Sequence, residues 1–290
     1  MTRMLAFVAA LLLTAITVSS ACVAGSSTPL SFTIEPDRGS ERIQVHFDRS
    51  NDRGAHWSSS FRTSELSGLD LAALNGGVIR PIRFAVIREP GRIDCAGSGG
   101  NAMARGNCAI SADAGFNDFL AAHGIARPTG EQTLTLIAVR ARRDLIGSLS
   151  QARYPTPDID KIVELSAVGV TPDYIRGLAG QNYRPSSLDT LVQFAALKIT
   201  PEYVGSFIRA GYTNLDPDEL VQLKALNITP EYVAGFERLG YRHLPVDTLV
   251  QLKALDVTPE FVRAVQQGDT LPSPDHLVQL RAVSRDLRRH

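Results

Sequence analysis

The sequence predicts an α+β protein in which an antiparallel β domain precedes a short α-solenoid of repeated helix pairs. Thr-Pro-Asp/Glu-Tyr/Phe begins at residues 171, 200, 229 and 258, so the C-terminal half repeats every 29 residues. Apolar and polar residues alternate between residues 32 and 112, as they do in strands with one face on a core. We therefore expect the β domain over residues 29–125 and the helix pairs over residues 126–290.

Each repeat is expected to begin its second helix at the Thr-Pro pair. A threonine hydroxyl accepts a free backbone N–H at a helix N-terminus, and proline suits the first helical position because no N–H is needed there. The acidic residue that follows lies at the positive end of the helix dipole. Residue types that favour a left-handed backbone stand at the expected helix ends, at Asn182, Gly211, Gly240 and Asp269.

The first helix of each unit precedes the Thr-Pro pair. Its apolar residues are spaced as on one helix face; in the third unit they are Leu220, Val221, Leu223, Leu226 and Ile228. This Leu-x-x-Leu-x-x-Leu order argues against a leucine-rich repeat, the other architecture with a period near 29. A degenerate unit over 130–157 has Arg142-Arg143 in place of Thr-Pro. A last helix from Ser273-Pro274 is expected to cap the array.

The β domain is expected to contain strands near 43–47, 57–62, 82–86, 92–97 and 104–111, with short helices near 64–74 and 114–123. Cys95 and Cys108 fall on the last two strands, which a glycine-rich turn joins. We therefore predict a disulfide across this hairpin. A reactive thiol pair is the alternative, but the spacing is not Cys-x-x-Cys.

The first residues have the pattern of a secretory signal. Arg3 precedes an apolar run over 5–18, and small residues occupy 19–21. The run is shorter than the roughly 20 residues of a membrane-spanning helix. We predict a signal peptide over 1–21, cleaved after residue 21 or as late as residue 25, and export to the periplasm or the exterior. Cys22 is then either the acylated N-terminus of a lipoprotein or part of the discarded segment. A third hypothesis is that the apolar run is retained as an N-terminal membrane anchor.

Charge and composition exclude several functional classes. The chain carries 30 basic and 30 acidic residues, so it lacks the basic excess that nucleic-acid binding requires. No histidine pair has the spacing of a metal site, and 97–100 lacks the Lys-Ser/Thr ending of a phosphate loop. Residues 48–54 resemble part of a calcium loop but lack its glycine and glutamate. We therefore predict no catalytic residue, no metal and no cofactor.

The repeats offer one candidate functional surface. Stacking would align Gln193, Gln222, Gln251 and Gln279 in one column and Lys224 and Lys253 in another. We predict that these residues bind a protein or peptide partner in the cell envelope; a solvated face is the alternative. A second hypothesis is a β domain that binds a small ligand or glycan through Trp57 and the glycine-rich turn. A third is a hydrolase that uses His46, Asp48 or His56.

The unit Leu-Val-Gln-Leu-Lys-Ala-Leu-x-Ile/Val-Thr-Pro-Glu-Tyr-Val, followed by Gly-Tyr, resembles the helix-pair repeats of uncharacterised exported bacterial proteins. It is also similar to repeats at the C-terminus of zinc metallopeptidases of the β-lactam-sensor type. The resemblance covers about residues 129–290, and Arg92–Ser111 stands where relatives have a glycine-rich hairpin with aromatic residues. No zinc-binding helix is present, so the resemblance implies an accessory or sensory role without catalysis.

Overall fold

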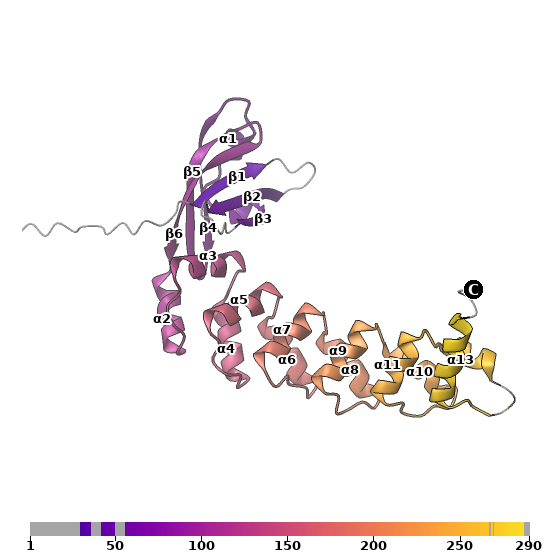
Figure 1. The fold of residues 1–290 in the computed structure, drawn as a ribbon. Helices are drawn as coiled ribbons and strands as arrows, with labels where there is room; N and C mark the ends of the chain where they lie inside the picture. The colour runs from indigo at the N-terminus through magenta and orange to yellow at the C-terminus, as the bar shows by residue number, and fades with distance from the viewer. Residues whose placement is uncertain (1–29, 36–41, 50–55, 267, 269, 287–290) are drawn as a thin grey trace, which may run out of the picture.

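The computed structural model describes residues 30–35, 42–49, 56–266, 268 and 270–286. It confirms the α+β class, with a six-stranded antiparallel sheet followed by a series of helices. The sheet stands at one end of the helical array and projects away from the array's long axis (Figure 1). The predicted signal peptide and Cys22 lie outside the described residues. No helix in the described ranges is both long enough and apolar enough to cross a bilayer.

The sheet has the strand order β3-β2-β1-β6-β5-β4, and every neighbouring pair is antiparallel. The strands are β1 Leu30–Glu35, β2 Arg42–Arg49, β3 His56–Arg62, β4 Arg80–Arg88, β5 Gly91–Gly100 and β6 Met103–Ala112. The sheet curls so far that the segment after edge strand β3 reaches the other edge strand. Ser67 and Ala85 of β4 exchange backbone hydrogen bonds of 2.9 and 2.8 Å there.

The alternation of residue types determines which face of the sheet is buried. Phe32 on β1 and Phe84 on β4 meet edge to face at 4.9 Å between ring centroids inside the curl. Leu134 and Ile137 of helix α3 (Gly130–Ala138) belong to the same core cluster, so this helix closes the lower end of the sheet. The first helix of the degenerate unit is therefore part of both the sheet core and the array.

The predicted disulfide is present. Cys95 on β5 lies directly opposite Cys108 on β6, with Cα atoms 4.1 Å apart. The hairpin turn, however, is formed by Asn101 and Ala102, which have φ angles of 55° and 61°, and the preceding glycines belong to β5. A Cβ at Gly97 would lie 2.0 Å from the Arg105 carbonyl oxygen, so this glycine permits close approach of the two strands.

Two details of the β domain differ from the sequence prediction. The alternating region that begins at residue 32 predicts no separate first strand, whereas Leu30–Glu35 forms β1. The helix expected over 64–74 is instead a 3-10 turn, Thr63–Glu65, and helix α1, Leu71–Asn75. Gly68, with φ of +83°, interrupts the run, and the Asp70 carboxylate then caps α1 by accepting the Ala72 and Ala73 N–H groups.

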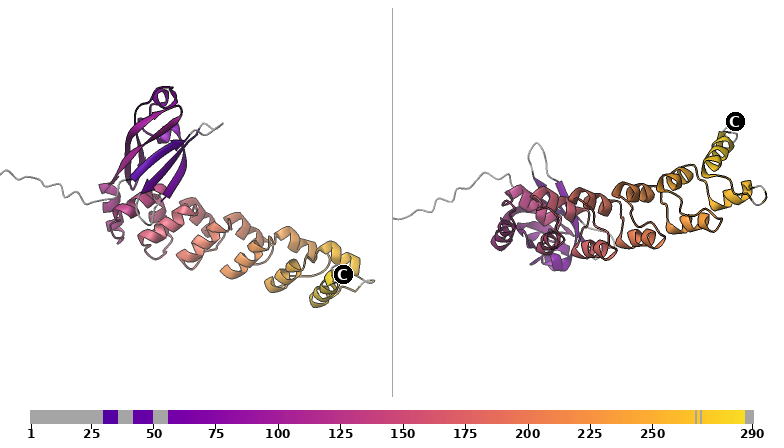
Figure 2. Two further views of the ribbon diagram at one scale, coloured as in Figure 1. Left: turned by 45° about the horizontal axis from the view of Figure 1, so that its top comes forward. Right: turned by 90° about the horizontal axis from the view of Figure 1, so that it is seen from below.

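The array consists of two layers of short helices, which Figure 2 shows as two rows. The first helices of the units form one layer: α3, α5 Ile159–Ala167, α7 Leu188–Ala196, α9 Pro217–Ala225, α11 Val246–Ala254 and α13 Pro274–Asp286. The second helices form the other: α4 Arg143–Gln151, α6 Pro172–Gly180, α8 Pro201–Arg209, α10 Pro230–Glu237 and α12 Pro259–Val265. Helix α2, Ala114–Ala122, lies outside the repeat, and its Phe116 and Leu120 pack against the first units.

The repeat boundaries follow the predicted chemistry. The hydroxyls of Thr171, Thr200, Thr229 and Thr258 each accept the backbone N–H of the residue three positions later. Asn182, Gly211 and Gly240 have positive φ angles of 54°, 95° and 107°, while Asp269 lies outside the described residues. The turn within each unit also uses a left-handed residue. These residues, which the sequence reasoning did not identify, are Arg140, Gly169, Lys198, Asn227 and Asp256.

Successive second helices approach closely because a small residue faces the next unit's proline. A Cβ built at Gly177 would lie 2.7 Å from Cγ of Pro201, and one at Gly235 would lie 2.5 Å from Cγ of Pro259. Ser206 occupies the same position in the unit between them. The proline therefore serves as an N-terminal helix residue and as a packing surface for the preceding unit.

Charged residues join the sheet to the array. Glu65 accepts hydrogen bonds from Arg88 on β4 at 2.9 Å and from Arg140 after α3 at 3.0 Å. Burial raises the pKa of Glu65, but the Arg62 backbone N–H and the two arginines outweigh it and hold the pKa below its usual value. Helix α4 lacks a threonine cap, and the Glu89 carboxylate from the β4–β5 turn accepts the Arg143 backbone N–H at 2.8 Å instead. The sheet thus supplies a cap that the degenerate unit lacks.

Candidate functional site

The structure places the four glutamines of the candidate surface on the exposed side of the first-helix layer. Gln193, Gln222, Gln251 and Gln279 lie on α7, α9, α11 and α13, and all four are exposed. Within the described part of the chain, none of their side chains makes a hydrogen bond or a close ring contact. They form a row of amide groups that the fold does not use internally. We call these four residues the glutamine column.

The two lysines of the candidate surface are placed differently. Lys224 and Lys253 are half-buried, and each ammonium lies 4.7 Å from the centroid of a tyrosine ring on the preceding second helix, Tyr203 and Tyr232 respectively. Arg281 makes the corresponding contact with Phe261 at 4.8 Å. Cations over aromatic faces stabilise the folded chain. The lysine column therefore links the two helix layers, whereas the glutamine column faces outward.

The tyrosines of the Thr-Pro-Asp/Glu-Tyr motif connect neighbouring units. The hydroxyl of Tyr174 donates to the Ile199 carbonyl at 2.6 Å, that of Tyr203 to the Ile228 carbonyl at 2.9 Å, and that of Tyr232 to the Val257 carbonyl at 2.7 Å. Each bond reaches 25 residues ahead into the turn before the next Thr-Pro. Burial raises the pKa of all three tyrosines, so these hydroxyls keep their protons at neutral pH.

A second set of hydroxyl bonds lies at the other side of the units. Tyr212 donates to the Leu244 carbonyl at 2.8 Å, and Tyr241 donates to the Pro272 carbonyl at 2.6 Å. The repeated tyrosines and lysines are thus engaged within the array. The glutamine column is the part of the candidate surface that remains available to another molecule.

Sequence reasoning missed an acidic column beside the glutamines. Each first helix from α5 onward carries an exposed aspartate in its first turn. The first four of these aspartates recur every 29 residues and the last follows after 28; they are Asp160, Asp189, Asp218, Asp247 and Asp275. Asp189 pairs with Lys161 of the preceding first helix at 2.6 Å. Carboxylates near a helix N-terminus interact favourably with its dipole, which accounts for this column without a ligand.

The polar residues proposed for a hydrolase lie on the outer face of the sheet. Asp48 Oδ1 is 3.2 Å from His56 Nδ1, and His46 Nε2 is 3.8 Å from Glu35 Oε2. Their side chains are between 41% and 74% exposed, so water screens both pairs. The described residues contain no group of three or more His, Cys, Asp or Glu side chains placed to hold a metal ion. The candidate calcium loop over 48–54 lies mostly outside the described residues.

Trp57, the basis of the glycan hypothesis, belongs largely to the sheet core. Its ring stacks on Phe47 with centroids 4.7 Å apart and meets Phe61 edge to face at 5.9 Å. The Gly97–Gly100 segment pairs with β6 along its length, and no helix follows it. The tryptophan and the glycines therefore build the curled sheet.

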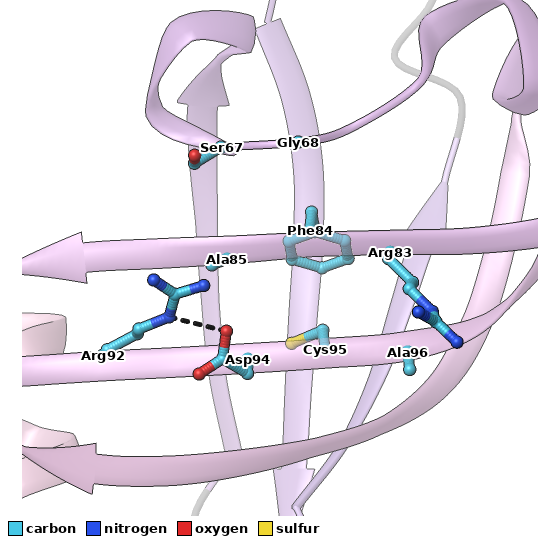
Figure 3. A pocket seen from close by; sticks show the side chains of 9 residues that line it. All are labelled: Ser67, Gly68, Arg83, Phe84, Ala85, Arg92, Asp94, Cys95 and Ala96. Atoms are coloured by element: carbon cyan, nitrogen blue, oxygen red, sulfur yellow. Dashed lines mark hydrogen bonds and ion pairs between the residues drawn. The ribbon is translucent and has the colours of Figure 1, made fainter.

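A shallow hollow of about 400 Å³ lies on the outer face of β4 and β5 (Figure 3). Arg92 and Asp94 form an ion pair of 2.6 Å at one side, while Arg83 extends away from that pair at the other. Ala85 and Ala96 contribute small side chains to the floor. The described lining contains no side chain suited to act as a nucleophile with an adjacent base.

Comparison with known proteins adds no assignment, since no protein-family model matches the chain and no curated protein or solved structure matches it significantly.

Proposed function

We propose that this protein is a non-enzymatic, exported interaction module of the periplasm or cell envelope, with a sensory or accessory role, whose helical array binds a protein or peptide. One observation carries the proposal. The glutamine column is exposed in four successive first helices and has no partner among the described residues, whereas the repeated lysines and tyrosines make contacts within the array. Stacked helix pairs of this kind provide long binding surfaces.

The spacing of the column suits an extended polypeptide. Packed helices lie about 8–10 Å apart, and an extended chain advances about 3.3 Å per residue. Successive glutamines therefore come level with about every third residue of a bound strand. A glutamine amide both donates and accepts, so it can bond to a backbone C=O and N–H of the partner. This recognition would depend on main-chain geometry more than on partner side chains.

Export is supported by the N-terminal pattern and by the disulfide. Disulfides persist in oxidising compartments and are rare in the cytosol. The Cys95–Cys108 bridge is consistent with an extracytoplasmic location. A lipid anchor at Cys22 would hold the module at a membrane surface, and mass spectrometry of the mature N-terminus tests this part of the proposal directly.

The test is cross-linking and capture from envelope extract with the mature chain. We expect Gln222→Ala with Gln251→Ala to lose a partner that the wild-type chain retains. Lys224→Met with Lys253→Met tests whether the ammonium groups also contribute. Glu237→Gln with Arg238→Ala is the matched control, because both residues are exposed on the second-helix layer. Capture that is equal for the glutamine variant and this control would contradict the proposal.

Fewer structural observations support the two alternative functions. Hydrolysis through His46, Asp48 and His56 would need a nucleophile and a site shielded from bulk water. The three side chains are 41% to 74% exposed and line a hollow of about 310 Å³. Ligand binding through Trp57 would need a ring that is free to stack, and Phe47 already occupies one of its faces.

A further inference from the structure

A hollow lies at the first junction of the array, between the α3–α4 turn and the α5–α6 turn. It has a volume of about 440 Å³. Leu145, Ser166 and Val170 line it, together with Arg140, Arg142 and Arg176. Leu145 and Val170 are buried core residues, so they give the hollow an apolar wall.

The repeat explains why this junction is hollow. Leu145 corresponds by the 29-residue period to Tyr174, Tyr203 and Tyr232, while Ser166 corresponds to Lys224 and Lys253. At later junctions the tyrosine ring crosses to the next unit, its hydroxyl donates to a turn carbonyl, and a lysine covers the ring where one is present. Leucine has no hydroxyl and no ring, and the serine is too short to cover one.

Two polar groups mark the unfilled space. Val170 occupies the position whose carbonyl accepts the tyrosine hydroxyl at later junctions, as Ile199 does from Tyr174. Ser166 Oγ is buried and has no hydrogen-bond partner. A buried hydroxyl without a partner costs free energy, so it indicates that the packing at this junction is incomplete.

The charges around the hollow argue against an anionic occupant. Arg140 is bound to Glu65 at 3.0 Å, Arg142 is bound to Asp144 at 2.8 Å, and Arg176 pairs with Asp173. The N-terminus of α6 is already capped by Thr171 and begins with a proline that has no N–H. The guanidinium groups of these paired arginines are planar and can still stack on an aromatic ring.

We propose that this hollow binds a 4-hydroxyphenyl group, which takes the place of the tyrosine that the first unit lacks. The ring would lie between Leu145 and Val170, and its hydroxyl would donate to the Val170 carbonyl, as the chain's own tyrosines do one unit later. The group can come from a tyrosine of a bound polypeptide or from a free phenolic compound. The first source rests on the proposed function and would make the hollow an anchor pocket for the partner.

Titration of the mature chain, followed by NMR or calorimetry, tests the proposal with three probes. We expect saturable binding of p-cresol and of N-acetyltyrosinamide, and roughly 5- to 10-fold weaker binding of N-acetylphenylalaninamide, which cannot donate to the carbonyl. Preference for N-acetyltyrosinamide over p-cresol assigns the site to a polypeptide; equal or reversed affinity assigns it to a free phenol. Absence of saturable binding by either phenol overturns the proposal.

Variants locate the binding. Leu145→Tyr supplies the ring from within the chain and is expected to abolish probe binding and raise the melting temperature. Ser166→Lys brings a lysine side chain across the hollow and should weaken probe binding. It provides an independent test in case Leu145→Tyr folds poorly. Ala195→Lys is the matched control, because Tyr174 already fills the equivalent space in the next unit. Probe binding that survives both Leu145→Tyr and Ser166→Lys would overturn the assignment. These residues are separate from the glutamine column, so either proposal can fail alone.

Discussion

The Glu89 carboxylate accepts a 2.8 Å hydrogen bond from the backbone N–H of Arg143, 54 residues later in the chain. A residue of the sheet therefore caps a helix of the array. We expect Glu89→Ala to destabilise the protein by about 1 kcal/mol, the usual cost of losing a helix N-cap. Glu89→Gln keeps an accepting oxygen and should lose less. Urea denaturation measures both, and a Glu89→Ala variant as stable as the wild type would show that the contact is incidental.

The contact of Gly235 with Pro259 predicts opposite effects for one substitution at two helical glycines. Gly235→Ala places a methyl group 2.5 Å from the proline ring, so we expect a loss of about 1–3 kcal/mol from overpacking. Gly147→Ala in α4 meets no atom within 4 Å and should stabilise the protein by about 0.5–1 kcal/mol. Thermal unfolding of the two variants gives the signs, and a shared sign would refute the packing argument.

Tyrosine burial predicts a loss of stability at alkaline pH. Burial, with a contribution from Glu237, raises the pKa of Tyr212 to about 12. An unfolded tyrosine has a pKa of about 10, so between about pH 10 and 12 the unfolded chain releases a proton that the folded chain retains. The stabilisation is complete below pH 10 and is lost as the pH rises through that window. Urea midpoints of the wild type should fall more steeply there than those of Tyr212→Phe, and parallel curves would exclude this cause.

The Cys95–Cys108 bridge closes a short loop in the hairpin, with a sequence separation of 13. In the chain-entropy model a loop of this size gives about 3 kcal/mol. We expect Cys95→Ala with Cys108→Ala to lower the melting temperature, and a reductant to lower that of the wild type only. Equal melting temperatures for the wild type with and without reductant would contradict a stabilising role.

Features that depend on neighbouring residues could be predicted from the sequence. Thr200 and Pro201 fix a helix start through contacts within one turn, and the alternation around Cys95 and Cys108 fixes the face on which they lie. Gly68 shows the limit of this reasoning, because its left-handed φ divides what reads as one helix over 64–74 into two pieces. A periodic apolar pattern does not show where a backbone must bend.

Features that depend on the distance between units could not be predicted. The 25-residue reach of Tyr203 to the Ile228 carbonyl follows from how closely second helices stack, and that in turn depends on the small residues beside each proline. The sequence also could not predict that the glutamines and the lysines of the candidate surface point in different directions, because this too depends on how closely the units stack. Lys224 turns toward Tyr203, whereas Gln222 points away from the core, although only two positions separate them.

The tyrosine bonds run in one direction only, since each unit donates to the next, and Phe261 ends the series. Counting 25 residues from Phe261 reaches Asp286, the last residue of helix α13, whereas the acceptors of the earlier tyrosines lie in turns before a Thr-Pro pair. A hydroxyl at position 261 would have no equivalent turn carbonyl to donate to, and the phenylalanine there carries no hydroxyl. The series of tyrosine bonds therefore stops at α12, and one more unit would need both another Thr-Pro turn and a tyrosine at position 261 to continue it.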